Sequence, residues 1–173
     1  VGGGMTRQLT HRRQQHHLTN TSVWSWDGNW IYYDIRSDAN GSVFDGGRIE
    51  RVHTRSGEVE VVYRAQQDAC VGVVTSSPVE NKIAFIHGPE EPTADWSYCA
   101  YHRHGVWMRP GQGTEVQHLD ARDVVDPFTA GALRGGSHVH VFDDKGEWVS
   151  FTYEDHVLAM NPTGGQSNQR NVG

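Results

Sequence analysis

The sequence has few cysteines, little leucine and no long apolar run, and these shortages exclude several classes of protein. Its 173 residues contain two cysteines, Cys70 and Cys99, which lack metal-ligand spacing and are too few for a disulfide framework. No run approaches the roughly 20 apolar residues of a membrane-spanning helix. The formal net charge of −6 disfavours nucleic acid and anionic membrane surfaces as partners. We therefore expect a protein that binds neither nucleic acid nor a membrane.

The start of the chain carries no basic-then-apolar signal peptide. Residues 1–5, VGGGM, are interpreted as a tag or an unstructured leader, with Met5 as a natural start. Two isolated cysteines are compatible with a reducing compartment. We expect a cytoplasmic protein, or a periplasmic one if a signal peptide has been removed.

The composition favours β structure. Glycine occurs 20 times, and there are 6 tryptophans and 6 tyrosines, whereas leucine is scarce. Aromatic and β-branched residues are enriched in strands. No window keeps apolar residues at helical spacing over three turns. These features predict an all-β fold.

Three stretches share one pattern: an apolar strand, a polar tight turn, and a second apolar strand that ends in aromatic residues. They are TSVWSWDGNWIYYDIR from residue 21, VGVVTSSPVENKIAFIH from residue 71 and SHVHVFDDKGEWVSFTY from residue 137. Asp-Gly and Pro-x-x-Asn turns are typical of hairpins. A second hairpin follows each of the first two stretches, with turns at residues 56–57 and 110–113. Each unit is therefore predicted to contain four antiparallel strands.

Repeated four-stranded antiparallel units are typical of β-propeller blades, and a plain β-sandwich with similar turns is the alternative. The third unit offers only strands 137–142, 147–153 and 156–160, before a polar, Gly-rich tail over 161–173. Propellers close with about four to eight blades. We predict a partial β-propeller of about three blades over residues 6–160, the third incomplete, with the tail leading to missing blades.

The stretch WSWDGNWIYY, preceded by RQLT at residues 7–10, resembles the TolB-type propeller repeat, with Trp26 in place of the proline of that repeat. From residue 6 onward, nearly the whole chain resembles an uncharacterised bacterial family of TolB-like propeller proteins. The segments that carry this resemblance are GEVEVVYRA, VGVVT, FIHGPE, LRGGSHVHVF, VSFTY and RNVG. The resemblance implies a propeller and a chain longer than this one, and it carries no function.

A more distant resemblance, to oligogalacturonate lyases, bears on chemistry. These propellers bind a divalent metal through histidines, including a His-x-His on an innermost strand before the Asp-Gly turn and a glutamine three residues ahead. His138 and His140 match the pair, whereas Gly135 stands where the glutamine is expected. The resemblance implies a metal at His138 and His140, and it assigns no catalytic base here.

The spacing of His138 and His140 is compatible with that metal, because side chains two residues apart in a regular strand point to one face. Imidazole is a ligand for Mn, Zn, Fe or Ni, and a tight site needs at least a third ligand. The alternative is that the two histidines are structural, or that they only line the central channel of the propeller without binding a ligand. His104 and His102, on an outer strand, are expected to be structural. Further channel candidates are His16, His17, Asn20 and Asp68.

The main functional hypothesis is a propeller that binds a small anionic or carbohydrate ligand in its central channel. If it is an enzyme, we expect an oligogalacturonate-lyase-like β-elimination, in which a metal acidifies the C–H beside a sugar carboxylate. One alternative is a non-catalytic scaffold that binds a protein partner through its faces and through surface loops 88–97 and 121–136. Another is an accessory propeller of a larger enzyme. The tryptophans are expected to pack between blades: Trp24, Trp26, Trp30 and Trp148.

Overall fold

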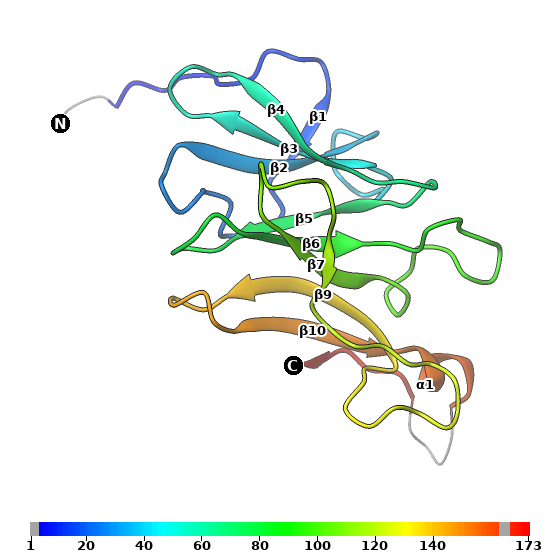
Figure 1. Ribbon diagram of the computed structural model, residues 1–173. Helices are drawn as coiled ribbons and strands as arrows, with labels where there is room; N and C mark the ends of the chain where they lie inside the picture. Colours follow the sequence, from blue (N-terminus) through cyan, green and yellow to red (C-terminus); the bar gives the residue numbers. More distant parts are fainter. Residues whose placement is uncertain (1–3, 163–166) are drawn as a thin grey trace.

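The computed structural model describes residues 4–162 and 167–173, and almost all of its regular structure is β. The strands form three antiparallel sheets that stack on one another in chain order (Figure 1). The all-β prediction is confirmed. Residues 1–3 of the expected leader and 163–166 of the expected tail lie outside the described residues.

The first sheet is a meander in which each strand pairs with the next. Its strands are β1 (Gln15–His17), β2 (Trp30–Arg36), β3 (Arg48–His53) and β4 (Val59–Arg64). The predicted turn at residues 56–57 joins β3 to β4. There Gly57 has a φ of 74°, which glycine adopts without steric cost, and its N–H donates to the carbonyl of His53.

The first strand of this sheet differs from the prediction. Of the strand expected at residues 21–24, the structure keeps only an isolated bridge between Trp24 and Ile31, and β1 lies earlier in the chain. The intervening segment is drawn toward the second sheet, because the carbonyl of Ser22 accepts a hydrogen bond of 2.7 Å from the N–H of Ser76.

The second sheet repeats the meander, and the third begins the same way. The second contains β5 (Val71–Ser76), β6 (Ile83–His87), β7 (His104–Met108) and β8 (Gln117–His118), in that order. The third contains β9 (Gly135–Phe142), β10 (Val149–Asp155) and β11 (Asn171–Val172). The predicted turn at 110–113 joins β7 to β8.

Residues 156–160 were expected to be a strand, and they form the short helix α1 (His156–Met160). The cause is local: the side chain of Asp155 accepts a hydrogen bond from the N–H of Leu158 and caps the first turn. The third strand of this sheet is instead β11, from the tail. No helix in the described part of the chain is long and apolar enough to cross a membrane.

The interface between the first two sheets is apolar. Tyr32 and Ile49 of the first sheet pack on Ile83 and Phe85 of the second, and all four are at most 1 % exposed. Burying a large apolar side chain contributes about 1.5–3 kcal/mol. This cluster is therefore the main core of the chain.

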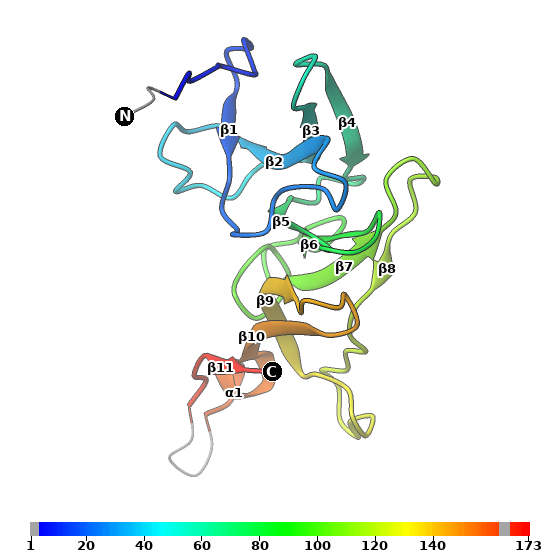
Figure 2. The same ribbon diagram turned by 90° about the vertical axis from the view of Figure 1, so that its left-hand side faces the viewer.

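The interface between the second and third sheets is polar and closely packed. A β-carbon added to Gly105 of β7 would lie 2.3 Å from Nε2 of His140, so only glycine allows the two strands to approach this closely. Figure 2 shows β5 and β9, the first strands of these sheets, close together, with β4 and β8 at the far edges of their own sheets.

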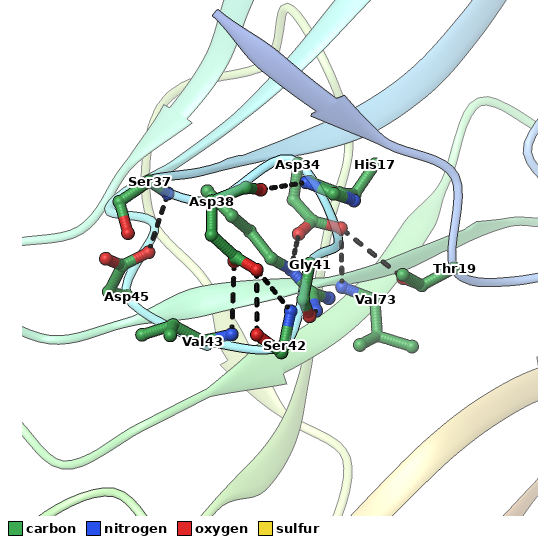
Figure 3. Close-up of polar contacts among 11 residues, drawn as sticks. His17, Thr19, Asp34, Ser37, Asp38, Gly41, Ser42, Val43, Asp45 and Val73 are labelled. Atoms are coloured by element: carbon green, nitrogen blue, oxygen red, sulfur yellow. Dashed lines mark hydrogen bonds and ion pairs between the residues drawn. The ribbon is translucent and has the colours of Figure 1, made fainter.

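A buried carboxylate joins the first sheet to the second (Figure 3). Asp34 on β2 is 1 % exposed. Its Oδ1 accepts hydrogen bonds from the N–H of Val73 on β5, at 3.1 Å, and from the hydroxyl of Thr19, and its Oδ2 pairs with Nε of Arg36 at 2.8 Å. Arg36 also donates to the carbonyl of Gly41 in the loop after β2. Asp34 and Arg36 together thus connect β2 with β5, with the segment at Thr19 and with the loop at Gly41.

The same backbone irregularity occurs in β5 and β9. Val73 and Val139 have φ angles of 55° and 54°, rare for β-branched residues, and each lies three residues before the end of its strand. Register shifts mark both places in the pairing with the next strand. The two strands therefore contain β-bulges at equivalent positions.

We expect Asp34→Ala to lower the free energy of unfolding by about 3–5 kcal/mol, because it leaves the N–H of Val73 without a partner and the buried Arg36 guanidinium without its carboxylate. Urea denaturation measures the change. The control is Asp144→Ala at an exposed position, with an expected effect within about 0.5 kcal/mol. A loss for Asp34→Ala below about 1 kcal/mol, typical of an exposed ion pair, would contradict this role.

Candidate functional site

The rings of His138 and His140 have different surroundings. His140 is 1 % exposed, and its Nε2 lies 3.0 Å from the hydroxyl of Ser137, on the side of the second sheet. His138 lies opposite Thr152, near the charges of Arg103 and Glu154. The two rings therefore do not line one site.

The bulge at Val139 explains this divergence. His138 pairs with Thr152 and Val141 with Ser150, so both Val139 and His140 stand opposite a single residue of β10. An extra residue inverts the alternation of side chains along the strand. The expectation that both rings point to one face of a regular strand is wrong for this reason.

The other candidate residues are dispersed. The ring of His16 lies edge-on to Tyr33, with centroids 4.8 Å apart, and Nε2 of His17 lies 3.1 Å from the carbonyl of Asp38. Asp68 is exposed. Asn20 alone contacts the expected pair, because its Nδ2 donates to the carbonyl of His140 at 3.0 Å.

These residues do not fit a bound metal. Within residues 4–162 and 167–173, no group of three or more His, Cys, Asp or Glu side chains is placed to hold a metal ion. His138 and His140, the pair implied by the lyase resemblance, leave β9 toward different faces.

A pocket at one edge of the second sheet brings together three other histidines. His87 ends β6, His104 begins β7 and His118 ends β8, so adjacent antiparallel strands place the rings side by side. The ring centroids of His87 and His104 are 5.9 Å apart, and those of His104 and His118 are 4.4 Å apart. The cavity has a volume of about 220 Å³, and Arg122 and Trp96 complete its wall.

The hydrogen bonds leave part of this cluster available to a ligand. His87 is satisfied, because its Nδ1 donates to the carbonyl of Gly88 at 2.7 Å and its Nε2 accepts from the hydroxyl of Tyr63 at 2.9 Å. The Nδ1 atoms of His104 and His118 lie 3.0 Å apart, so one donates to the other. Neither Nε2 of that pair has a hydrogen-bond partner in the described chain.

Arg122 gives this pocket its charge. The half-buried guanidinium donates to the carbonyl of His102 at 2.6 Å. Burial lowers the pKa of Arg122, and the charge of Asp120 acts in the opposite direction, so Asp120 is a carboxylate close enough to interact with it. Glu90 also lines the pocket and is exposed to solvent. Burial, and next the charge of Arg122, lower the pKa of His104 to about 2. The pocket thus offers a fixed cation beside a neutral imidazole.

Comparison with known proteins places the chain in a family. Residues 70–173 match the model of a family described as "Protein of unknown function (DUF3748)". The chain is also 49 % identical over 168 residues to the "Uncharacterized protein YidR" of Escherichia coli strain K12. The chain belongs to the DUF3748 family.

This alignment covers 96 % of the chain and 39 % of the relative, so the DUF3748 chain spans about two fifths of the length of that protein. Neither match is described as a TolB-like propeller or an oligogalacturonate lyase. No solved structure matches the chain.

Sequence reasoning missed the Arg122 pocket of this DUF3748 chain. It assigned His104 a structural role on an outer strand and placed Arg122 in a surface loop. A usable signal was present, because His87, His104 and His118 all fall at strand termini. In an antiparallel pair, the end of one strand lies beside the start of the next. Residues at such termini therefore meet at the same end of the sheet.

We expect the stability of the chain to fall as the pH drops below about 6.5. Burial lowers the pKa of His104 to about 2 and that of His138 and His140 to about 4, so the unfolded chain binds more protons below the ordinary histidine pKa of 6.5. Each group costs up to about 1.4 kcal/mol per pH unit between its two pKa values. Above about pH 6.5 these histidines are neutral in both states, and they no longer lower the free energy of unfolding.

Urea denaturation at pH 7.5, 6 and 5 measures this slope. His140→Gln should reduce it, whereas His11→Gln, at an exposed histidine, should leave it unchanged. Equal slopes for His140→Gln and the unmodified chain would contradict the assignment.

Proposed function

We propose that this DUF3748 chain forms three successive blades of a TolB-like β-propeller, and that its Arg122 pocket binds a small anionic ligand. The propeller is supported by the meander order of the first two sheets and by the equivalent bulges at Val73 and Val139. A sandwich would not require the same irregularity in successive first strands.

The outer faces of the first and third sheets are a second argument that further blades are present. Among the described residues, the second sheet is the one that other sheets cover on both faces. Since propellers close with about four to eight blades, three blades need others to complete the ring. The greater length of the relative provides chain for them.

The observation that supports the ligand proposal is the half-buried Arg122 guanidinium in the wall of the pocket, which interacts with the charge of Asp120 and donates to the carbonyl of His102. A buried charge is stable when it is paired, and arginine presents a planar set of donors to carboxylate or phosphate. His104 and His118 lie beside it and add ring nitrogens. A sugar acid or another small carboxylate or phosphate satisfies this chemistry.

The proposal is limited to binding. An elimination reaction of the oligogalacturonate-lyase type requires the His138 and His140 rings to share a metal, and the bulge between them separates the rings. The pocket also lies at strand termini of one sheet, away from the first strands that would line a central channel.

We expect Arg122→Gln to weaken the binding of inorganic phosphate and of D-galacturonate by about tenfold or more, because it removes a charge-assisted hydrogen bond. Calorimetric titration of the 173-residue chain measures both affinities. Arg109→Gln is the matched control, since Arg109 pairs with Glu80 at 2.7 Å outside the pocket. Equal affinities of Arg122→Gln and the unmodified chain would refute the site.

The propeller makes a separate prediction about Ser150. This exposed residue of β10 lies between Val149 and Phe151, which face the second sheet, so its side chain points the other way. A cysteine introduced at Ser150 should react with a thiol reagent in the 173-residue chain and be protected in a longer protein with further blades. A cysteine at Ser56, in the β3–β4 turn, should react equally in both. Equal reactivity at position 150 would contradict coverage of this face.

A further inference from the structure

A second cavity lies between the second and third sheets and is distinct from the Arg122 pocket. It has a volume of about 270 Å³. The second sheet and the segment after it contribute Lys82 and Asp120 to its wall, and β9 contributes His140. Three aromatic residues also line it, Phe142, Trp148 and Phe151, together with Leu119, Val149, Gly146 and the acidic Glu147.

Two residues that line this cavity each have a buried polar atom without a hydrogen-bond partner in the described chain: Oδ2 of Asp120 and Nδ1 of His140. His140 is 1 % exposed, so bulk water does not reach it freely. A buried polar atom left unpaired costs about 1–3 kcal/mol. The pair of atoms therefore points to a ligand that hydrogen-bonds to both.

The hydroxyl of Ser137 connects the two side chains and limits their protonation. Its Oγ accepts from the N–H of Gly105 at 3.0 Å and lies 3.3 Å from Oδ1 of Asp120 and 3.0 Å from Nε2 of His140. The hydroxyl of Ser137 has one proton and donates it in a hydrogen bond either to Oδ1 of Asp120 or to Nε2 of His140. In the first case Nδ1 of His140 is an acceptor, and in the second, with Asp120 protonated, Nδ1 is a donor.

A hydroxyl group satisfies both arrangements, because it donates and accepts. Oδ2 of Asp120 is an acceptor in either case and takes a second hydroxyl as donor. An ammonium group only donates, and a carboxylate only accepts. A ligand with two hydroxyl groups therefore fits both arrangements, whereas an ammonium fits only the first, in which both atoms are acceptors.

The cavity is lined by charges of both signs, from Lys82, Asp120 and Glu147. Asp120 would face an anionic ligand with like charge when ionised. Lys82, whose Nζ lies 5.7 Å from the centroid of the Phe142 ring, would repel a cationic one. Trp148 is 76 % exposed and offers an apolar ring face at the surface. This exposure differs from the inter-blade packing expected for Trp148 and leaves its indole free to stack on a ligand.

We propose that this cavity binds a neutral cyclic polyol, with two hydroxyl groups on Asp120 and His140 and one face of its ring against Trp148. The two cavities share none of their lining residues. Asp120 and Arg122 interact electrostatically, so a substitution of Trp148 rather than of Asp120 separates the two sites. A water-filled cavity is the competing outcome.

The first experiment titrates the 173-residue chain with myo-inositol, D-glucose and D-xylose and follows tryptophan fluorescence and heat. D-glucuronate and D-glucosamine are the charged counterparts. We expect saturable binding of at least one neutral polyol, with the charged compounds about tenfold weaker or more. Absence of saturable binding by all three neutral compounds, or tighter binding of a charged one, overturns the proposal.

The second experiment compares two exposed tryptophans. Trp148→Ala should weaken polyol binding by about tenfold and abolish the fluorescence change. Trp26→Ala is the matched control, because Trp26 is 52 % exposed in the turn of the first sheet and does not line the cavity. Equal affinities of Trp148→Ala and Trp26→Ala would overturn the proposal.

Asp120→Asn tests the polar end of the cavity and should also weaken polyol binding by about tenfold. Trp148→Ala should leave phosphate binding at Arg122 unchanged. If the unmodified chain binds a polyol but not phosphate, the anion site alone is refuted. If the unmodified chain binds phosphate but no polyol, the polyol site alone is refuted.

Discussion

The carboxylate of Asp34 sets how the first two sheets meet. A backbone N–H inside a bulge has no ladder partner, and Asp34 supplies one to Val73 across the sheet interface. Gly72 allows this approach, since a β-carbon there would lie 2.9 Å from Oδ2 of Asp34. Arg36 neutralises the buried charge. The orientation of β5, and with it the apolar core around Tyr32 and Phe85, follows from this contact.

The two interfaces of the second sheet have different chemistry, and this difference places the candidate sites. Apolar side chains fill most of the interface with the first sheet, and the three histidines gather where that face reaches the edge. The interface with the third sheet is built on Ser137, His140 and Asp120, whose hydrogen bonds are incomplete within the described chain. A buried polar group without a partner already carries a desolvation cost. A ligand that hydrogen-bonds to it removes this cost and therefore binds more tightly.

Much of the fold could be predicted from local patterns. Alternation and turn chemistry located most of the strands and the turns at residues 56–57 and 110–113, because both depend on residues adjacent in sequence. The errors have other causes. Residues 156–160 have an apolar pattern compatible with a strand, but the Asp155 cap favours a helical turn. The strand expected before Trp24 is interrupted because Ser22 bonds to Ser76, more than 50 residues away.

The sequence alone settled the all-β class, the three repeated hairpins and the residue types available for binding, since these follow from composition and short-range spacing. Tertiary structure decided which of those residues meet. His138 and His140 are neighbours along the chain, yet a bulge sends their rings to different faces. Arg122, His104 and His87 are separated along the chain and share one pocket. A site forms from side chains that pack together, and their packing depends on register and backbone irregularities stabilised by contacts between distant segments.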